Sequence, residues 1–284
     1  MVGFYLLGDM GSGNDYQIMV AKSLSININN NKEKNLFVCG LGDNIYDEGC
    51  SSIEDEQFIQ KFEEPYQDID NNIKFYMCLG NHDYGWDLWD KKERSKHQIN
   101  YAIQSQKDKK KWFMPSNYYT FDKGNISFFV VDTNFENQTE NEIKDQLSFM
   151  IKKINKSKKK WKIVYGHHTL KSIGGHGNCE DLMGKFFKKL IEESNFDVYM
   201  CGHDHNKQVI NTKLYGKNLL LIVCGTGGAI LDKTINLSNI DTKDIEFFST
   251  NYGFAYCEQN KNKLEFKFYN ELNELEFYYP LTRK

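Results

Sequence analysis

The sequence of 284 residues contains only three prolines and has no stretch rich in proline, glycine or serine that would act as a linker. No apolar run reaches the roughly 18 residues that a membrane-spanning helix needs. The formal net charge is -3, so the chain also lacks the basic excess typical of nucleic-acid-binding proteins. With 40% hydrophobic and 26% charged residues, the sequence predicts one globular domain over residues 1–284. We expect a monomer with no nucleic-acid partner and no membrane span.

The cysteines give no clear sign of a disulfide framework, and a signal peptide is not evident. The seven cysteines are an odd number, and four of them lie within short apolar runs: Cys39, Cys78, Cys201 and Cys224. Buried free thiols are the simplest interpretation. Met1 to Leu7 has neither the basic region nor the small-residue cleavage site of a signal peptide, and it predicts a strand instead. A cytoplasmic location is therefore favoured, unless an upstream signal has been removed.

Short apolar runs alternate with longer amphipathic segments, which is typical of an α/β protein. Strands are predicted over 4–7, 35–41, 73–79, 126–131, 161–165, 197–201 and 219–223. Helices are predicted over 15–24, 53–62, 139–154 and 180–194, and the lysine clusters 107–111 and 156–160 indicate solvated helix ends. From Gly253 onward, apolar and polar residues alternate, which predicts antiparallel hairpins that close one side of the fold.

Side chains that can bind metals follow the ends of these strands. They are Asp9, Asp43, Tyr46, Asn81, His167, His203 and His205. Loops at the carboxyl ends of strands form the crevice where α/β proteins bind ligands. At five strands a glycine stands beside the donor and lets the backbone turn sharply. A lone Gly-Asp or His-x-His is more often an ordinary turn or loop, but repetition at five strands is hard to reconcile with that interpretation.

The number of donors indicates more than one metal ion. A single catalytic zinc keeps three protein ligands and one open position, so seven oxygen and nitrogen donors exceed its needs. The set fits two ions about 3.5–4 Å apart that share a carboxylate, as in two-metal phosphatases.

The order Asp-x-Gly, Gly-Asp-x-x-Tyr, Gly-Asn-His-Asp, Gly-His and Gly-His-x-His resembles the calcineurin-like metallophosphoesterases and, within them, the purple acid phosphatases. Two positions indicate the purple acid phosphatases within the superfamily: Gly11 stands where most of the superfamily has a histidine, and Tyr46 stands in the second motif. The similarity covers most of the chain, including 112–119 and 172–177, and is to the small, tartrate-resistant type. It implies a four-layer α/β/β/α sandwich, in which helices flank two mixed sheets.

The resemblance also implies a role for each donor. Asp9, Tyr46 and His205 would hold Fe(III); Asn81, His167 and His203 would hold a divalent ion (Fe, Zn or Mn); and Asp43 would bridge the two. His82 and His176 resemble the catalytic histidines that contact the substrate phosphate and the leaving group. His168 matches no ligand position of the family and is interpreted as a pocket-wall or surface residue. Asp204 is expected to support the turn or the ligands around it.

The implied reaction is hydrolysis of phosphate monoesters by in-line attack of a metal-bound hydroxide, on a small phosphorylated substrate or a phosphoprotein. Phosphodiesterase or nucleotide pyrophosphatase activity is left open as an alternative, because the shape of the pocket determines which esters are accepted. The sequence around Trp86, Trp89 and Asn178 does not reveal that shape. A non-catalytic scaffold is a further alternative, since the family includes members that have lost ligands and anchor membrane complexes. All seven ligand types are present here, which counts against a scaffold. A reducing cytosol could favour Fe(II) or another metal over Fe(III).

Overall fold

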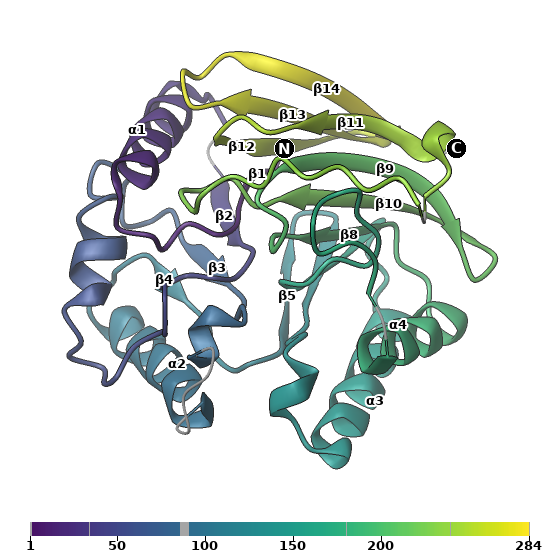
Figure 1. Ribbon diagram of the computed structural model, residues 1–284, viewed down its shortest axis with the longest axis horizontal. Coiled ribbons are helices and arrows are strands. Elements are labelled where there is room, and N and C mark those ends of the chain that lie inside the picture. Colours follow the sequence, from purple (N-terminus) through teal and green to yellow (C-terminus); the bar gives the residue numbers. More distant parts are fainter. Residues whose placement is uncertain (1, 34, 86–90, 180, 239, 284) are drawn as a thin grey trace.

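The computed structural model describes residues 2–33, 35–85, 91–179, 181–238 and 240–283 (Figure 1). It contains two seven-stranded mixed sheets. The first runs in the order β14 (Leu275–Thr282), β13 (Lys263–Asn270), β12 (Gly253–Asn260), β1 (Val2–Leu7), β2 (Leu36–Gly40), β3 (Phe75–Met77) and β4 (Trp112–Phe113). The second runs β11 (Ile245–Ser249), β9 (Lys207–Leu214), β10 (Lys217–Cys224), β8 (Val198–Cys201), β7 (Trp161–Tyr165), β6 (Ile126–Val130) and β5 (Tyr119–Lys123).

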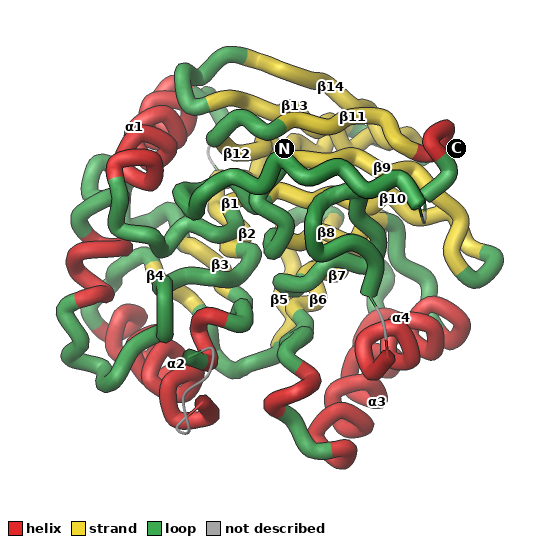
Figure 2. Tube along the Cα trace, viewed as in Figure 1, coloured by secondary structure: helices red, strands yellow, loops and turns green. Residues whose placement is uncertain are grey.

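Helices flank both sheets (Figure 2). The α-helices are α1 (Asp15–Asn30), α2 (Lys91–Lys107), α3 (Glu140–Lys156) and α4 (Asp181–Glu193). Short helical turns occur at η1 (Ile59–Glu63), η2 (His82–Tyr84), η3 (Phe135–Asn137) and η4 (Thr242–Asp244). In Figure 1, α1 and α2 lie beside the first sheet, and α3 and α4 lie beside the second. The predicted four-layer α/β/β/α fold is therefore confirmed.

Successive side chains of β6 point alternately into the core between the sheets and toward the helices outside them. Phe128 points between the sheets, where its ring meets Phe4 of β1 edge-on at 5.1 Å. Phe129, its neighbour, points outward into the cluster formed with Met150 of α3 and Phe186 of α4. Because successive residues of a strand face opposite sides, one apolar strand can serve both the central core and the helical layer.

Local signals set several boundaries. The Asn14 side chain accepts hydrogen bonds from the backbone of Tyr16 and Gln17 and so caps α1. Thr139 caps α3 through a capping box with Glu142. The lysine clusters do lie at helix ends, since α2 ends at Lys107 and α3 at Lys156.

Some segments differ from the sequence prediction. Of the helix predicted over 53–62, only the second half is helical, at 57–58 and in η1, and turns precede it. The Asp55 carboxylate accepts the backbone N–H groups of Ser51 at 2.8 Å and Gln57 at 3.1 Å, so it caps the helical part at this point. Helix α2 and strands β4, β5, β9 and β11 were not predicted. Glu180, where a helix was predicted to begin, lies outside the described residues, as do Trp86 and Trp89.

The hairpins predicted from Gly253 onward are confirmed. β12, β13 and β14 pair antiparallel at one side of the first sheet. All seven cysteines are free, and the four in apolar runs lie buried in strands or directly after one. None of the described helices is long and apolar enough to cross a membrane.

The two sheets meet at the carboxyl ends of their parallel strands. The backbone N–H of Gly8, after β1, donates to the carbonyl of Cys224, at the end of β10, at 3.0 Å. Gly227 donates in turn to the carbonyl of Gly8 at 3.0 Å. The loops that carry the predicted metal ligands are thus joined across the two sheets at one end of the sandwich.

Candidate metal centre

All seven predicted donors lie together at this end, in two contacting groups. The first, called here the Tyr46 group, consists of Asp9, Tyr46 and His205. The Tyr46 hydroxyl lies 3.1 Å from Asp9 Oδ1 and 3.1 Å from His205 Nε2. Asp9, Asp43 and His205 also present ligand atoms that lie within 4.8 Å of one another. Loops after β1, β2 and β8 supply these side chains.

The second group, called here the His167 group, consists of Asn81, His167 and His203. His167 Nε2 lies 3.0 Å from Asn81 Oδ1 and 3.2 Å from His203 Nδ1. Asp43 lies between the two groups: its Oδ2 is 2.8 Å from the Tyr46 hydroxyl and 3.3 Å from His167 Nε2. One carboxylate is therefore within reach of both sets of donors.

Three of the donors have left-handed backbone conformations that L-residues rarely adopt. The φ angles are 57° at Asp9, 51° at Asp43 and 70° at His203. Such conformations cost roughly 1–3 kcal/mol each and persist where the surroundings fix them, commonly at functional sites. Here the surroundings include the Asp9 carboxylate, which accepts the backbone N–H of His203 at 3.0 Å.

The glycines beside the donors act mainly by leaving space. A Cβ at Gly80 would lie 2.1 Å from Asp43 Oδ1, and one at Gly202 would lie 2.3 Å from Asp9 Oδ2. The predicted role in sharp turning applies to Gly42, whose φ is 88°, but at Gly80 and Gly202 close approach of a carboxylate is the reason. At Gly11 a Cβ would lie 2.0 Å from the carbonyl oxygen of Asn44, so the loops after β1 and β2 pack without room for a side chain there.

Backbone carbonyls orient two of the imidazoles. His167 Nδ1 donates to the carbonyl of Leu41 at 2.9 Å, and His205 Nδ1 donates to that of Ile230 at 2.7 Å. Since a carbonyl only accepts, each Nδ1 carries a proton and each Nε2 faces the centre. Burial lowers the pKa of His167, but the charge and hydrogen bond of Asp43 raise it to about 9. Burial also lowers the pKa of His205, but the hydrogen bond and the charge of Asp9 raise it to about 9. The site therefore stabilises positive charge at both Nε2 atoms.

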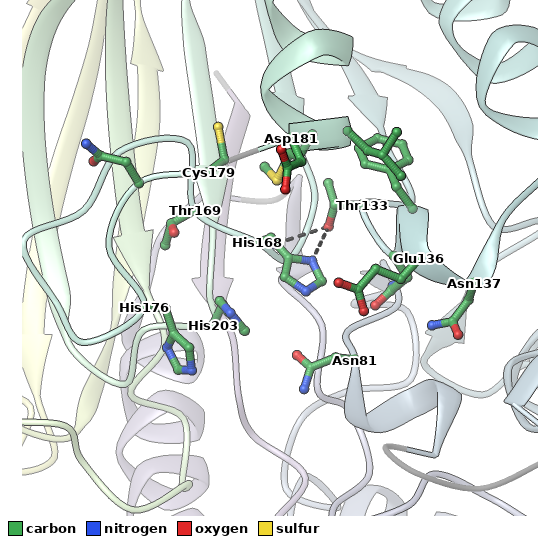
Figure 3. A pocket seen from close by; sticks show the side chains of 15 residues that line it. Asn81, Thr133, Glu136, Asn137, His168, Thr169, His176, Cys179, Asp181 and His203 are labelled. Atoms are coloured by element: carbon green, nitrogen blue, oxygen red, sulfur yellow. Dashed lines mark hydrogen bonds between the residues drawn. The ribbon is translucent and has the colours of Figure 1, made fainter. Parts of the chain in front are cut away.

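A cavity of about 460 Å³ borders the His167 group (Figure 3). Asn81, His176 and His203 line it on the side of the metal centre. His168 lines it too, with Nδ1 at 2.8 Å from the Thr133 hydroxyl, so the interpretation as a pocket-wall residue is confirmed. Burial and the neighbouring His167 lower the pKa of His168 to about 3, which leaves its ring neutral.

The two predicted catalytic histidines lie at the edge of the centre. His82 Nε2 is 4.0 Å from Asp43 Oδ2, and its Nδ1 is 2.6 Å from the carbonyl of Asp47. The His176 ring lies 3.9 Å from that of His203, and its Nδ1 is 3.0 Å from Asp204 Oδ1. Asp204 is buried and supports His176 in this way.

Sequence reasoning missed two supporting residues. The buried Asp83 carboxylate accepts the backbone N–H groups of Asn44, Ile45 and Gly80. Its place in Gly-Asn-His-Asp was the available signal. The Thr133 hydroxyl accepts the backbone N–H of His167 at 3.2 Å, and no motif in the sequence marks it.

The sequence matches the calcineurin-like phosphoesterase family over residues 3–207, and the chain belongs to that family. More particularly, it is 27% identical to purple acid phosphatase 7 of Arabidopsis thaliana, over 95% of this chain and 82% of that protein. It is 31% identical to tartrate-resistant acid phosphatase type 5 of Rattus norvegicus, over 61% of this chain and 56% of that protein. The resemblance to the purple acid phosphatases and to the tartrate-resistant type is confirmed.

Solved structures share the fold. GAP50, described as the anchor in the inner membrane complex of Plasmodium, has a TM-score of 0.79 and 24% identity, over 100% of this chain and 89% of that one. Purple acid phosphatase PPD1 from yellow lupin (Lupinus luteus) seeds has a TM-score of 0.75 and 18% identity, over 99% of this chain and 54% of that one. At these identities the likeness is one of fold.

Proposed function

We propose that this chain is a hydrolase of phosphate monoesters that works with a dinuclear metal centre. The observation that carries the proposal is the position of Asp43, within 2.8 Å of the Tyr46 hydroxyl and 3.3 Å of His167 Nε2. Two ions that share a carboxylate require a residue placed in this way. The donors converge on this carboxylate from the loops of both sheets.

The chemistry of the donors supports a division between the ions. Carboxylate and phenolate oxygens suit a hard trivalent ion, whereas imidazole and amide donors suit a borderline divalent one. The Tyr46 group would therefore hold Fe(III), the His167 group would hold Fe, Zn or Mn in the divalent state, and Asp43 would bridge. When bound, such a pair lowers the pKa of a water molecule and neutralises charge on the phosphate.

The residues around the centre would bind the ester and move a proton. His176 is held by Asp204 and lines the cavity, so its ring is placed to contact a phosphate oxygen or the leaving oxygen. His82 lies on the side of Asp43 and would contact the phosphate from there. A positioned imidazole can give a proton to the departing alkoxide, which is general-acid catalysis.

A non-catalytic scaffold is the second candidate, because GAP50, which shares the fold, is described as an anchor. The complete set of seven donors in contact argues for catalysis instead. A phosphodiesterase or nucleotide pyrophosphatase would use the same centre, so the substrate must decide between them and a monoesterase.

The test combines elemental analysis with a substrate panel. We expect two metal ions per chain after purification under metal-replete conditions, and faster hydrolysis of p-nitrophenyl phosphate than of bis(p-nitrophenyl) phosphate. Asp145→Asn, an exposed change on α3, is the control and should alter neither result. One metal or fewer would overturn the dinuclear centre. Two metals without turnover would favour the scaffold, and preferential cleavage of the diester would favour the phosphodiesterase.

A further inference from the structure

His168 lies in the loop after β7, next to the proposed ligand His167, and its side chain lines the cavity beside the metal centre (Figure 3). Its ring centroid is 4.5 Å from that of His203, and the ring of His176 lies 3.9 Å from the same His203. Two histidines that are not among the seven donors therefore contact one proposed ligand of the divalent ion. The proposed function assigns a role to His176 but none to His168.

Neighbouring hydroxyl groups hold both the backbone and the ring of His168. The backbone N–H donates to the Thr133 hydroxyl at 3.1 Å, and the carbonyl accepts a hydrogen bond from the buried Tyr199 hydroxyl at 2.7 Å. The ring is held as well, because Nδ1 lies 2.8 Å from the same Thr133 hydroxyl. A side chain fixed in this way is preorganised to contact a ligand with its remaining polar atom.

The hydrogen bonds of Thr133 determine which ring nitrogen of His168 carries the proton. A hydroxyl oxygen has two acceptor lone pairs and one donor hydrogen. Thr133 Oγ1 already accepts the backbone N–H groups of His167 at 3.2 Å and His168 at 3.1 Å, so only its hydrogen is left for Nδ1. Nδ1 is therefore the acceptor in this contact, and the proton of the neutral ring is on Nε2.

The Nε2–H group of His168 is accessible from the cavity. His168 forms no hydrogen bond through Nε2 with another residue that the structure describes. The residue is partly exposed, and Nε2 is not among the buried polar atoms that lack a partner. Figure 3 shows the ring between Thr133 and Asn81, with the second ring nitrogen on the side of Asn81, a member of the His167 group. The Glu136 carboxylate is turned toward the ring in this view but forms no hydrogen bond with it.

We propose that His168 contacts the substrate, and that its Nε2–H donates a hydrogen bond to an oxygen of the phosphate bound at the centre. A fixed donor beside the His167 group would stabilise the negative charge of the phosphate. His168 would thus be a third histidine at the substrate, in addition to His82 and His176. The inference rests on the proposed function, because it requires a phosphate bound at the metal centre.

Two substitutions separate this role from a structural one. The amide of asparagine reaches about as far from the backbone as Nδ1, so His168→Asn can keep the contact with Thr133 but has no group at the position of Nε2. The amide of glutamine reaches the position of Nε2, so His168→Gln can keep the donor. We expect His168→Asn to lower kcat/KM for p-nitrophenyl phosphate by about 10–100-fold, the usual effect of losing a hydrogen bond to a charged group, and His168→Gln to recover most of this loss. A larger loss in His168→Gln than in His168→Asn would show that the ring only supports the loop, and would overturn the proposal.

Binding of inorganic phosphate measures the same contact without turnover. Calorimetry on zinc-loaded protein should give a Kd for phosphate about tenfold or more higher in His168→Asn than in wild type, and a value for His168→Gln closer to wild type. His97→Asn, a change on α2 outside the centre, is the matched control and should keep the wild-type Kd. Elemental analysis should show equal metal content in all four proteins. Loss of metal in His168→Asn would mean that the ring holds an ion, and a Kd equal to that of wild type would mean that it does not contact phosphate; either result would overturn the proposal.

The wild-type protein gives a further measurement that needs no variant of His168 to fold. In ¹⁵N NMR spectra of the zinc-loaded protein, we expect the His168 proton on Nε2 and the shift of an unprotonated nitrogen at Nδ1, and added phosphate should move the Nε2–H signal. A proton on Nδ1, or an Nε2–H signal that phosphate does not move, would overturn the proposal. If no monoester is hydrolysed but phosphate still binds through His168, the proposed function fails and the assignment of His168 stands.

Discussion

The Asp83 carboxylate accepts the backbone N–H of Asn44 at distances of 2.9 and 3.1 Å to its two oxygens. It also accepts the backbone N–H of Gly80 at 2.8 Å. The loop after β2, which carries Asp43 and Tyr46, is thereby tied to the loop after β3, which carries Asn81. The distance between the two donor groups thus depends on a residue that belongs to neither.

We expect Asp83→Asn to loosen both loops. The amide of asparagine would place an N–H₂ group against backbone N–H donors that now meet a carboxylate oxygen. The free energy of unfolding should fall by about 2–3 kcal/mol, the typical cost of losing hydrogen bonds to a charged group. Urea unfolding of metal-free protein measures this loss, and elemental analysis should show reduced metal content. Stability and metal content equal to those of Asp145→Asn would contradict the role given to Asp83.

Asp43→Ala should remove the link between the two donor groups. We expect loss of activity together with loss of metal, because both proposed ion sites use this carboxylate. Burial alone would raise the pKa of Asp43, but the charge of His167 outweighs burial and holds this pKa well below its usual range. The carboxylate is therefore ionised at any working pH. Elemental analysis of the variant beside wild type is the measurement. A variant that keeps two ions would exclude Asp43 as the bridge.

The sequence predicted those parts of the fold whose signals are local. β7 was predicted with the observed bounds, because Trp161 to Tyr165 is a compact apolar run between polar segments. The donors were found because each follows such a run beside a glycine. The sequence explained only part of the role of the glycines. Gly80 and Gly202 leave space for the carboxylates of Asp43 and Asp9, which come from distant segments of the chain, and no local pattern reports such an approach.

Other elements depend on tertiary contacts that the sequence does not show. The buried face of α2 mixes the polar residues Ser95 and Gln98 with Tyr101 and Ala102, so it lacks the regular apolar spacing that predicts a helix. β9 begins with the buried Lys207, which pairs with Glu276 of β14 from the other sheet. The contact between Asp204 and His176 joins residues 28 apart in the chain.

His82→Ala and His176→Ala should each lower kcat by about 10²–10⁴-fold if the histidine supplies general-acid catalysis. Metal content should stay unchanged, because the seven donors are complete without them. His97→Ala is the matched control, since His97 lies on α2 outside the centre. The measurements are steady-state kinetics and elemental analysis on the same preparations. Full turnover in both variants would leave the two histidines with a structural role alone.

Tyr46 offers a test of the proposed Fe(III) site that does not depend on substrate. A phenolate bound to Fe(III) donates electron density to a strongly oxidising ion, so light moves charge from ring to metal and colours the protein. Carboxylate and imidazole ligands do not give such an absorption band in the visible. The Tyr46 hydroxyl lies 3.1 Å from both Asp9 Oδ1 and His205 Nε2, where such an ion would be held.

Protein isolated aerobically with iron should therefore absorb visible light, and Tyr46→Phe should bleach it, because the change removes the donor oxygen and keeps nearly the same ring volume. Reduction to a mixed Fe(III)/Fe(II) pair should shift the band without abolishing it, since Tyr46 stays on the trivalent ion. Tyr165→Phe is the control: this buried tyrosine donates to the carbonyl of Tyr76 between the sheets, and its loss should leave the spectrum unchanged. If iron-loaded, oxidised and active protein keeps its visible band in Tyr46→Phe, the phenolate is not the iron ligand, and the proposed division of the two ions is wrong.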